Sequence, residues 1–462
     1  MTKLGHGFIT GFDWNLYPEA ERFLQKQVNN FLNSNRFARK LAKRMEKETS
    51  TRFFDWIDYI SLPSKKINRK KFLRLGFRNV NNFDGYHVFK NPGSIFFNVL
   101  LSHDDYVEVC LKPENIEYFV KKIKVRVKIE GKKFNSLRKA YINKQGKYIL
   151  SAIERRGNNS FSVREDNDTS EYKKALRMFF KRKRKFNSDK EGMVYTHKLI
   201  KKVLKRLSKE RTADAFFRNE RIYWEKRNKS GQIQNKRQNE LGLGWGNHDH
   251  HTYRSSRENF TRLVRIFEDI GYKCRERFYA GERAGWGAQI LEHPICDIVL
   301  FADVDISKDE RHKDFSHKGL KRIDKFGTVG LWIGLHGESI LQAGMHHLEA
   351  RFMFERLMKD LFNYNVGIMK PFSYFGFLKQ AFTKGERWIV DKKRLANLLR
   401  KGVIRKEQFD EFLKEGAIGS HMENLQRREG FKGFNQDSVT AIIKATDPRK
   451  QLHKDYHKHT GA

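Results

Sequence analysis

The sequence predicts an α+β fold whose C-terminal half contains two βαβββ units around a shared cavity. Two observations carry this prediction. After residue 240, helical and strand-like apolar periods follow one another in the order β-α-β-β-β, and two of the strand-like segments open with adjacent histidines. A third observation separates the halves, because residues 1–240 hold 30 of the 39 excess positive charges. The change in charge marks a boundary near residue 240.

The composition is that of a folded protein with more than one domain. A chain of 462 residues with 39% hydrophobic side chains is long enough for two to four domains. No apolar run reaches the ~20 residues of a membrane span, and residues 1–12 lack the apolar core of a signal peptide. The three cysteines lie far apart and imply no disulfide framework. We therefore expect a reduced, cytoplasmic protein with no membrane partner.

Residues 1–170 are expected to form a mixed α/β domain. Helical spacing runs from Tyr17 to Lys47, and short alternating or apolar runs within 85–112 predict strands. Residues 121–128 also alternate like a strand. No catalytic constellation stands out in this half, so its role stays open.

Residues 171–240 are expected to be a basic helical region that ends in a polar linker over 232–240. The segment contains KRKRK at 181–185, and apolar residues recur at helical spacing within 198–211. A solvated face of a packed helix explains this charge without any partner. Contact of the basic N-terminal half with a polyanion is the alternative, although no RNA- or DNA-binding motif accompanies the charge.

The first unit, residues 241–330, places a histidine-rich strand before a helix and three further strands. The helix is expected over Ser255–Tyr272, with Ser255 and Glu258 at capping-box spacing and Gly271 at its C-terminal end. The following strand-like runs span 273–280, 286–293 and 297–306.

The second unit, residues 331–462, repeats this order more loosely. A strand over 344–352 precedes a helix, expected at 354–364. The remaining elements are strands at 366–372, 376–383 and 418–427, with a helical insertion at about 391–415. The two units open with His250-His251 and with His346-His347. Paired βαβββ units are the building block of the vicinal-oxygen-chelate fold, in which curved sheets enclose one divalent metal ion.

Two segments of this half resemble the 2-oxoadipate dioxygenase/decarboxylase family. NHDHHTYRS at 247–255, followed by a helix ending in GY and by the strand DIVLFADVDI, resembles the first half of the family's domain. SHMENLQRREGFKGFNQDSV at 420–439 is similar to the segment in which a glutamate strand leads into a turn. The resemblance covers about residues 240–450.

The resemblance implies an Fe(II) enzyme that uses dioxygen. Members convert a 2-oxo dicarboxylic acid such as 2-oxoadipate to a 2-hydroxy acid one carbon shorter, here 2-hydroxyglutarate, with loss of carbon dioxide in lysine degradation. It further implies His250, His346 and Glu423 as metal ligands, with His347 as a competitor of His346. Arg254 matches the arginine that binds a substrate carboxylate, a task that suits a planar guanidinium.

Two other functions fit the same residues. Other metal-dependent enzymes of this fold, such as isomerases, lyases and extradiol dioxygenases, use similar ligands. A basic, nucleic-acid-associated protein without catalysis is the alternative from a different class. Two imidazoles and one carboxylate would leave about three open positions on an octahedral Fe(II), enough for a chelating substrate and dioxygen.

Overall fold

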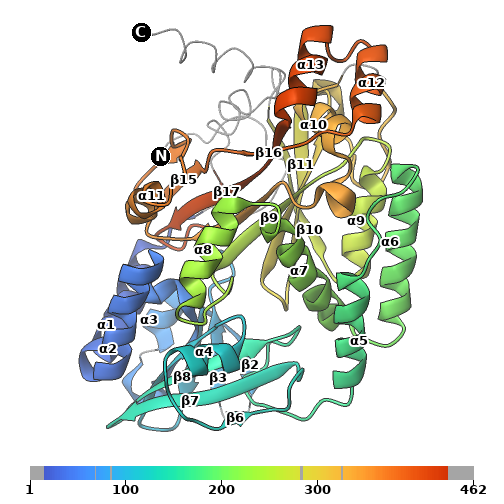
Figure 1. The fold of residues 1–462 in the computed structure, drawn as a ribbon. Coiled ribbons are helices and arrows are strands. Elements are labelled where there is room, and N and C mark those ends of the chain that lie inside the picture. The colour runs from blue at the N-terminus through green and yellow to red at the C-terminus, as the bar shows by residue number, and fades with distance from the viewer. Residues whose placement is uncertain (1–14, 68, 84–85, 281–284, 324–325, 435–462) are drawn as a thin grey trace, which may run out of the picture.

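The computed structural model describes residues 15–67, 69–83, 86–280, 285–323 and 326–434. Each half of the chain contributes one β-sheet, and the N-terminal sheet lies below the C-terminal sheet in Figure 1. Among the described residues, no helix combines the length and the apolar character needed to cross a membrane.

The N-terminal half contains an eight-stranded sheet with the strand order β2-β3-β4-β1-β5-β8-β7-β6. Its strands are β1 (Ile57–Pro63), β2 (Arg78–Phe83), β3 (Tyr86–Lys90), β4 (Asn98–Ser102), β5 (Val107–Leu111), β6 (Ile129–Glu130), β7 (Leu137–Gln145) and β8 (Tyr148–Arg155). Its helices are α1 (Pro18–Ser34), α2 (Arg36–Arg44), α3 (Arg69–Arg74) and α4 (Ile116–Lys122), with short turns η1 (Met45–Thr49), η2 (Phe53–Trp56) and η3 (Ser64–Lys66).

The strand order shows that this half is itself a pair of βαβββ units. The elements β1-α3-β2-β3-β4 form one unit and β5-α4-β6-β7-β8 the other. In each unit the first and last strands pair in parallel, and the two first strands pair antiparallel in the middle of the sheet. The sequence predicted a mixed α/β region here but not this second pair of units.

Two local predictions in this half need correction. The helix expected from Tyr17 to Lys47 is broken at Asn35, whose side chain accepts a hydrogen bond from the Ala38 amide and caps α2. The strand expected over 121–128 is wrong, because α4 occupies its start and Lys124 then adopts a left-handed turn with φ 58°. The strands expected within 85–112 are confirmed as β3, β4 and β5.

The C-terminal sheet has nine strands in the order β10-β11-β12-β9-β13-β17-β15-β14, with β16 paired to β17. They are β9 (His248–Arg254), β10 (Lys273–Tyr279), β11 (Trp286–His293), β12 (Ile298–Asp305), β13 (His347–Arg351), β14 (Ser373–Tyr374), β15 (Leu378–Phe382), β16 (Glu386–Trp388) and β17 (Ala417–Arg427). The helices are α9 (Phe260–Asp269), α10 (Thr328–His336), α11 (Phe354–Phe362), α12 (Lys392–Arg400) and α13 (Lys406–Glu415), with η4 (Lys308–Glu310) and η5 (Ser339–Ala343). The α+β class and the two βαβββ units predicted for this half are confirmed.

Two details of the C-terminal half differ from the sequence pattern. Helix α9 begins at Phe260 rather than Ser255, because the Ser255 amide still donates to the Asp303 carbonyl at the end of the strand pairing. The strand expected at 366–372 is reduced to a single bridge between Ile368 and Thr383. The helical insertion and the closing strand agree with prediction.

Helices α5 (Thr169–Phe180), α6 (Asp189–Leu204), α7 (Lys209–Glu225) and α8 (Lys229–Asn239) belong to the C-terminal core. Phe217 of α7, for example, packs edge-on against His251 and Tyr253 of β9. The segment expected to be a polar linker is helix α8, where Gln234 is buried and donates to the Thr49 carbonyl at 2.9 Å. This helical region therefore covers the outer face of the C-terminal sheet.

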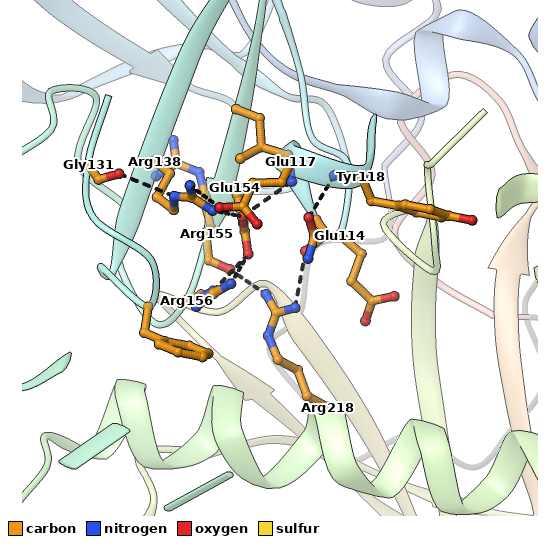
Figure 2. Close-up of polar contacts among 12 residues, drawn as sticks. Glu114, Glu117, Tyr118, Gly131, Arg138, Glu154, Arg155, Arg156 and Arg218 are labelled. Atoms are coloured by element: carbon orange, nitrogen blue, oxygen red, sulfur yellow. Dashed lines mark hydrogen bonds and ion pairs between the residues drawn. The ribbon is translucent and has the colours of Figure 1, made fainter. Parts of the chain in front are cut away.

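A buried network of arginines and glutamates joins the N-terminal sheet to α7 (Figure 2). Arg218 of α7 donates to the carbonyls of Glu114 at 3.1 Å and Arg155 at 2.9 Å. Arg138 and Arg156 both bind the carboxylate of Glu154, which is fully buried. Because buried polar groups are costly to leave unpaired, this network ties the two halves together.

Candidate metal centre

Three side chains meet on the inner face of the C-terminal sheet, opposite the helices. His250 of β9 lies directly across from Glu349 of β13, and Glu349 lies across from Glu423 of β17. Their ligand atoms all lie within 4.8 Å of one another, and His250 Nε2 contacts a carboxylate oxygen of Glu349. All three side chains are buried. Alternation along a strand turns the neighbours, such as His251, to the other face.

The imidazole of His250 is oriented by a carboxylate behind it. Its Nδ1 lies 3.0 Å from Oδ2 of Asp249, and Arg427 contacts the same oxygen at 3.2 Å. Burial lowers the pKa of His250 to about 4, even though Asp249 favours the charged form. The ring is therefore neutral near pH 7, with its proton on Nδ1 and the lone pair of Nε2 directed at Glu349.

The two glutamates face each other across β13 and β17. Burial raises the pKa of Glu423 to about 7, and burial together with Glu423 raises the pKa of Glu349 well above its usual range. Gln380 of β15 donates to Oε1 of Glu423 at 2.8 Å and fixes that carboxylate.

This donor set fits a divalent metal ion. An imidazole lone pair and two carboxylates point at one another, and Oε2 of Glu349 has no hydrogen-bond donor among the described residues. Such groups repel one another unless a proton or a metal cation lies between them. Nitrogen and oxygen donors of this kind suit Fe(II) and neighbouring divalent ions.

The structure brings together two of the three ligands implied by the sequence, His250 and Glu423, and places His346 outside the cluster. The Nδ1 of His346 lies 3.0 Å from the carbonyl of Gly419, and its ring packs against Trp332. Glu349 takes the third place. The reason is strand alternation, because β13 begins at residue 347 and turns residues 347 and 349 inward.

His347, the competitor of His346, lies at the rim of the cluster. Its Nε2 is 3.0 Å from Oε1 of Glu349 and 3.9 Å from Oε2 of Glu423, and Thr252 Oγ1 contacts the same nitrogen at 2.8 Å. The sequence carries a signal for Glu349 that the histidine pairs alone do not reveal. In HHLEARF the glutamate follows His347 by two residues, the spacing that shares one face of a strand.

A cavity of about 70 Å³ opens beside the cluster, and Arg254 lies in its wall. Nε of Arg254 is 3.8 Å from Oδ2 of Asp303, the residue opposite it on β12, so Arg254 does not brace Asp249. Burial raises the pKa of Asp303 to about 7 despite the nearby guanidinium. The rest of the wall is mainly aromatic and includes Phe278, Trp286, Phe301, Phe372, Phe382 and Phe434.

A second cavity, of about 140 Å³, lies between the two halves and shares His250, Phe301 and Phe434 with the first. Its wall carries basic residues from both halves, including Lys90, Lys112, Arg275, Arg351, Arg427, Arg428 and Lys432. The candidate metal centre is thus bordered by an aromatic cavity on one side and, on the other, by a cavity whose basic residues are largely paired with acidic ones.

Comparisons with known proteins give no family for this chain. No family model matches it, and no curated protein matches it. Among solved structures, a putative hydrolase from Shewanella frigidimarina NCIMB 400 is 14% identical, with coverage of 46% of this chain and 93% of that one, at a TM-score of 0.31. A mutant of 4-hydroxymandelate synthase from Streptomyces coelicolor is 9% identical, and the match covers 87% of this chain and 99% of that one at a TM-score of 0.29. Methylmalonyl-CoA epimerase from Mycobacterium tuberculosis is 9% identical, and the match covers 40% of this chain and 89% of that one at a TM-score of 0.23. These TM-scores are too low to indicate an activity. The fold is assigned from the strand order of the chain itself.

Proposed function

We propose that the chain is an Fe(II)-dependent dioxygenase/decarboxylase that acts on a 2-oxo acid. The supporting observation is the buried cluster of His250, Glu349 and Glu423 beside a cavity that Arg254 also lines. Bound Fe(II) would supply the activation of dioxygen and the redox chemistry, which no side chain of the cavity offers.

The side chains around the cluster divide the remaining tasks. His250, Glu349 and Glu423 hold the metal, with His347 close enough to join them or to bind substrate. Asp249 keeps the proton on Nδ1 of His250 so that Nε2 stays a donor to the metal.

Substrate binding is assigned to Arg254 and the aromatic wall. Arg254 and His250 point to the same face of β9, so a carboxylate bound by the guanidinium stays within reach of the cluster. The aromatic side chains exclude bulk water, which strengthens the ion pair between guanidinium and carboxylate.

The size and lining of the cavity limit the substrate. A cavity of about 70 Å³ suits a small acid, and Arg254 is the one lysine or arginine among the described residues that line it. For 2-oxoadipate, the second carboxylate would depend on neutral donors such as Thr252 and Gln380. We therefore include 2-oxoadipate and shorter monocarboxylic 2-oxo acids among the substrates to test.

Oxygen consumption by protein loaded anaerobically with Fe(II) tests the proposal. We expect oxygen uptake that depends on a 2-oxo acid and releases one carbon dioxide per oxygen consumed. Glu423→Gln should abolish uptake, whereas Gln426→Glu on the same strand serves as a charge control outside the cluster. Metal binding without oxygen uptake for any 2-oxo acid would instead favour an isomerase or lyase.

A further inference from the structure

A second group of metal-binding side chains lies at the edge of the C-terminal sheet, away from the first. It consists of Glu268 on the last turn of α9, Cys274 on β10, and His317 in the segment between β12 and α10. Oε1 of Glu268 lies 3.7 Å from the sulfur of Cys274 and 3.0 Å from Nε2 of His317. The three ligand atoms all lie within 4.8 Å of one another.

Two features distinguish this group from an ordinary surface ion pair. Asp314 binds Nδ1 of His317 at 2.9 Å, the carboxylate–imidazole arrangement that turns Nε2 of a histidine toward a metal. Strand β10 also has an irregular register between Cys274 and Glu276, and such bulges redirect side chains at sheet edges. Cys274 and His317 are exposed, so a hydrated cation has access to them.

We propose that Glu268, Cys274 and His317 form a second metal site, for a thiophilic divalent cation such as zinc. A thiolate, an imidazole and a carboxylate are each zinc ligands, and a water molecule would complete the tetrahedron. The first cluster lacks sulfur and favours a harder ion. The two sites therefore differ in the metal that they select.

The proposed metal links three elements that are distant in sequence. The segment around His317 is already held by Phe315, which packs in the core, and by Ser316, which donates to Gln289 at 2.8 Å. A metal at Glu268, Cys274 and His317 would fasten the same segment to α9 and β10. The site is thus structural, a clamp on the connection between β12 and α10.

Cobalt(II) titration of the full-length protein tests the site without interference from the first cluster. A thiolate-to-cobalt charge-transfer band reports only a site with a sulfur ligand, and His250, Glu349 and Glu423 provide none. We expect the band to saturate at one cobalt per chain in the wild type and in His250→Ala. Cys274→Ser should abolish it, whereas Cys296→Ser, which changes a cysteine outside the group, should not.

The other ligands give graded effects. His317→Ala and Glu268→Gln should weaken cobalt binding at least tenfold, and Asp314→Asn should weaken it about 10- to 100-fold by releasing the imidazole. Zinc should raise the Tm of His250→Ala but not of the His250→Ala/Cys274→Ser double variant. The proposal is overturned if the wild type shows no thiolate band, if His317→Ala leaves the band and affinity unchanged, or if zinc does not change Tm.

Discussion

The two halves share one strand topology but place different chemistry at its centre. In the C-terminal sheet, paired positions on β9, β13 and β17 carry His250, Glu349 and Glu423. In the N-terminal sheet, paired positions on β1, β5 and β8 carry Tyr59, Cys110 and Ser151. The first ladder brings together a group that could hold a metal ion, and the second contains no such group among the described residues.

In the N-terminal half, the buried carboxylate of Glu108 is neutralised by a lysine of the same sheet. The carboxylate of Glu108 accepts hydrogen bonds from Tyr59 at 2.7 Å and Ser151 at 2.5 Å, and Lys139 of β7 lies 2.8 Å from it. On β15, the counterpart of β7, the C-terminal half has the neutral Gln380 against Glu423. The buried carboxylate of the N-terminal sheet thus has an internal counter-ion, whereas Glu423 is paired with a neutral amide, and this difference favours a metal cation at the C-terminal cluster.

Replacement of Lys139, the cation beside Glu108, should have the largest effect on stability. Lys139→Met leaves Glu108 buried without its counter-ion, and breaking a buried ion pair from one side costs about 3–5 kcal/mol. Denaturant unfolding followed by circular dichroism measures the loss. The Lys139→Met/Glu108→Gln double variant should recover most of it, and a loss below about 1 kcal/mol for the single variant would contradict the assigned role.

Removal of a metal ligand from the C-terminal ladder should nearly abolish metal binding. We expect His250→Ala, Glu349→Ala and Glu423→Ala each to weaken iron binding by more than ~100-fold, beyond the usual effect of residues behind the ligands. Competition titrations under anaerobic conditions measure this, and Tyr59→Phe is the matched control in the other ladder. Full occupancy in both His250→Ala and Glu423→Ala would refute the site.

The same titrations decide between the adjacent histidines. His346 binds a backbone carbonyl outside the cluster, whereas His347 reaches both glutamates. We therefore expect His347→Ala to cost more metal affinity than His346→Ala. The opposite result would restore His346 as the ligand that the family resemblance implies.

A lysine placed beside Glu423, as Lys139 lies beside Glu108, should displace the metal. In Gln380→Lys an ammonium would approach Glu423 as Lys139 approaches Glu108, and its positive charge would oppose a divalent ion at close range. We expect iron binding to fall on the order of 100-fold while the metal-free protein stays folded. Gln380→Leu, which removes one neutral hydrogen bond, should cost no more than about tenfold.

The sequence predicted helices α9 and α11 well because both are amphipathic, with apolar residues at helical spacing. It missed β1, since every residue from Ile57 to Pro63 is buried and no alternation marks the strand. It also missed β7, where Arg138 and Lys139 resemble surface residues but are buried in ion pairs. Helix α8 was mistaken for a linker because its buried face is formed by glutamines.

The residues of the candidate site could likewise be predicted only in part from the sequence. Histidine-rich strand openings mark β9 and β13, and the family resemblance implies Glu423 on β17, and these three strands carry the cluster. The choice between His346 and Glu349 depended on where β13 begins, and a shift of one residue exchanges the two faces of a strand. Adjacent histidines leave that register undetermined in the sequence.

Substrate affinity should depend on the geometry of Arg254 rather than on its charge alone. Arg254→Lys keeps a cation but loses the planar pair of donors, so a 2-oxo acid should bind about 10- to 100-fold more weakly, or ~1.5–3 kcal/mol. Arg254→Ala should be worse, while iron occupancy is kept in both. Titration of 2-oxoadipate and shorter 2-oxo acids into the anaerobic iron protein, followed by the metal-to-ligand charge-transfer band, measures this. Equal affinities for wild type and Arg254→Lys would remove Arg254 from the substrate site.

The last expected effect is a pH dependence of the metal-free protein. Burial raises the pKa of Glu423 from 4.5 to about 7 and that of Asp303 from 3.8 to about 7. Between these pH values the folded state holds protons that the unfolded chain has released, so the free energy of unfolding falls as pH rises from about 4.5 to 7.

Each group contributes at most ~1.4 kcal/mol per pH unit to this slope. Denaturant unfolding at pH 5, 6 and 7 should show this slope, and Glu423→Gln should reduce it, while Asp303, Asp305 and Glu349, whose pKa values burial also raises, maintain the rest. Saturating Fe(II) should reverse the slope, because a metal competes with protons for the same carboxylate. An unchanged slope in Glu423→Gln would show that this carboxyl titrates as it does in the unfolded chain, and the contrast with the internally neutralised N-terminal half would then lose its electrostatic basis.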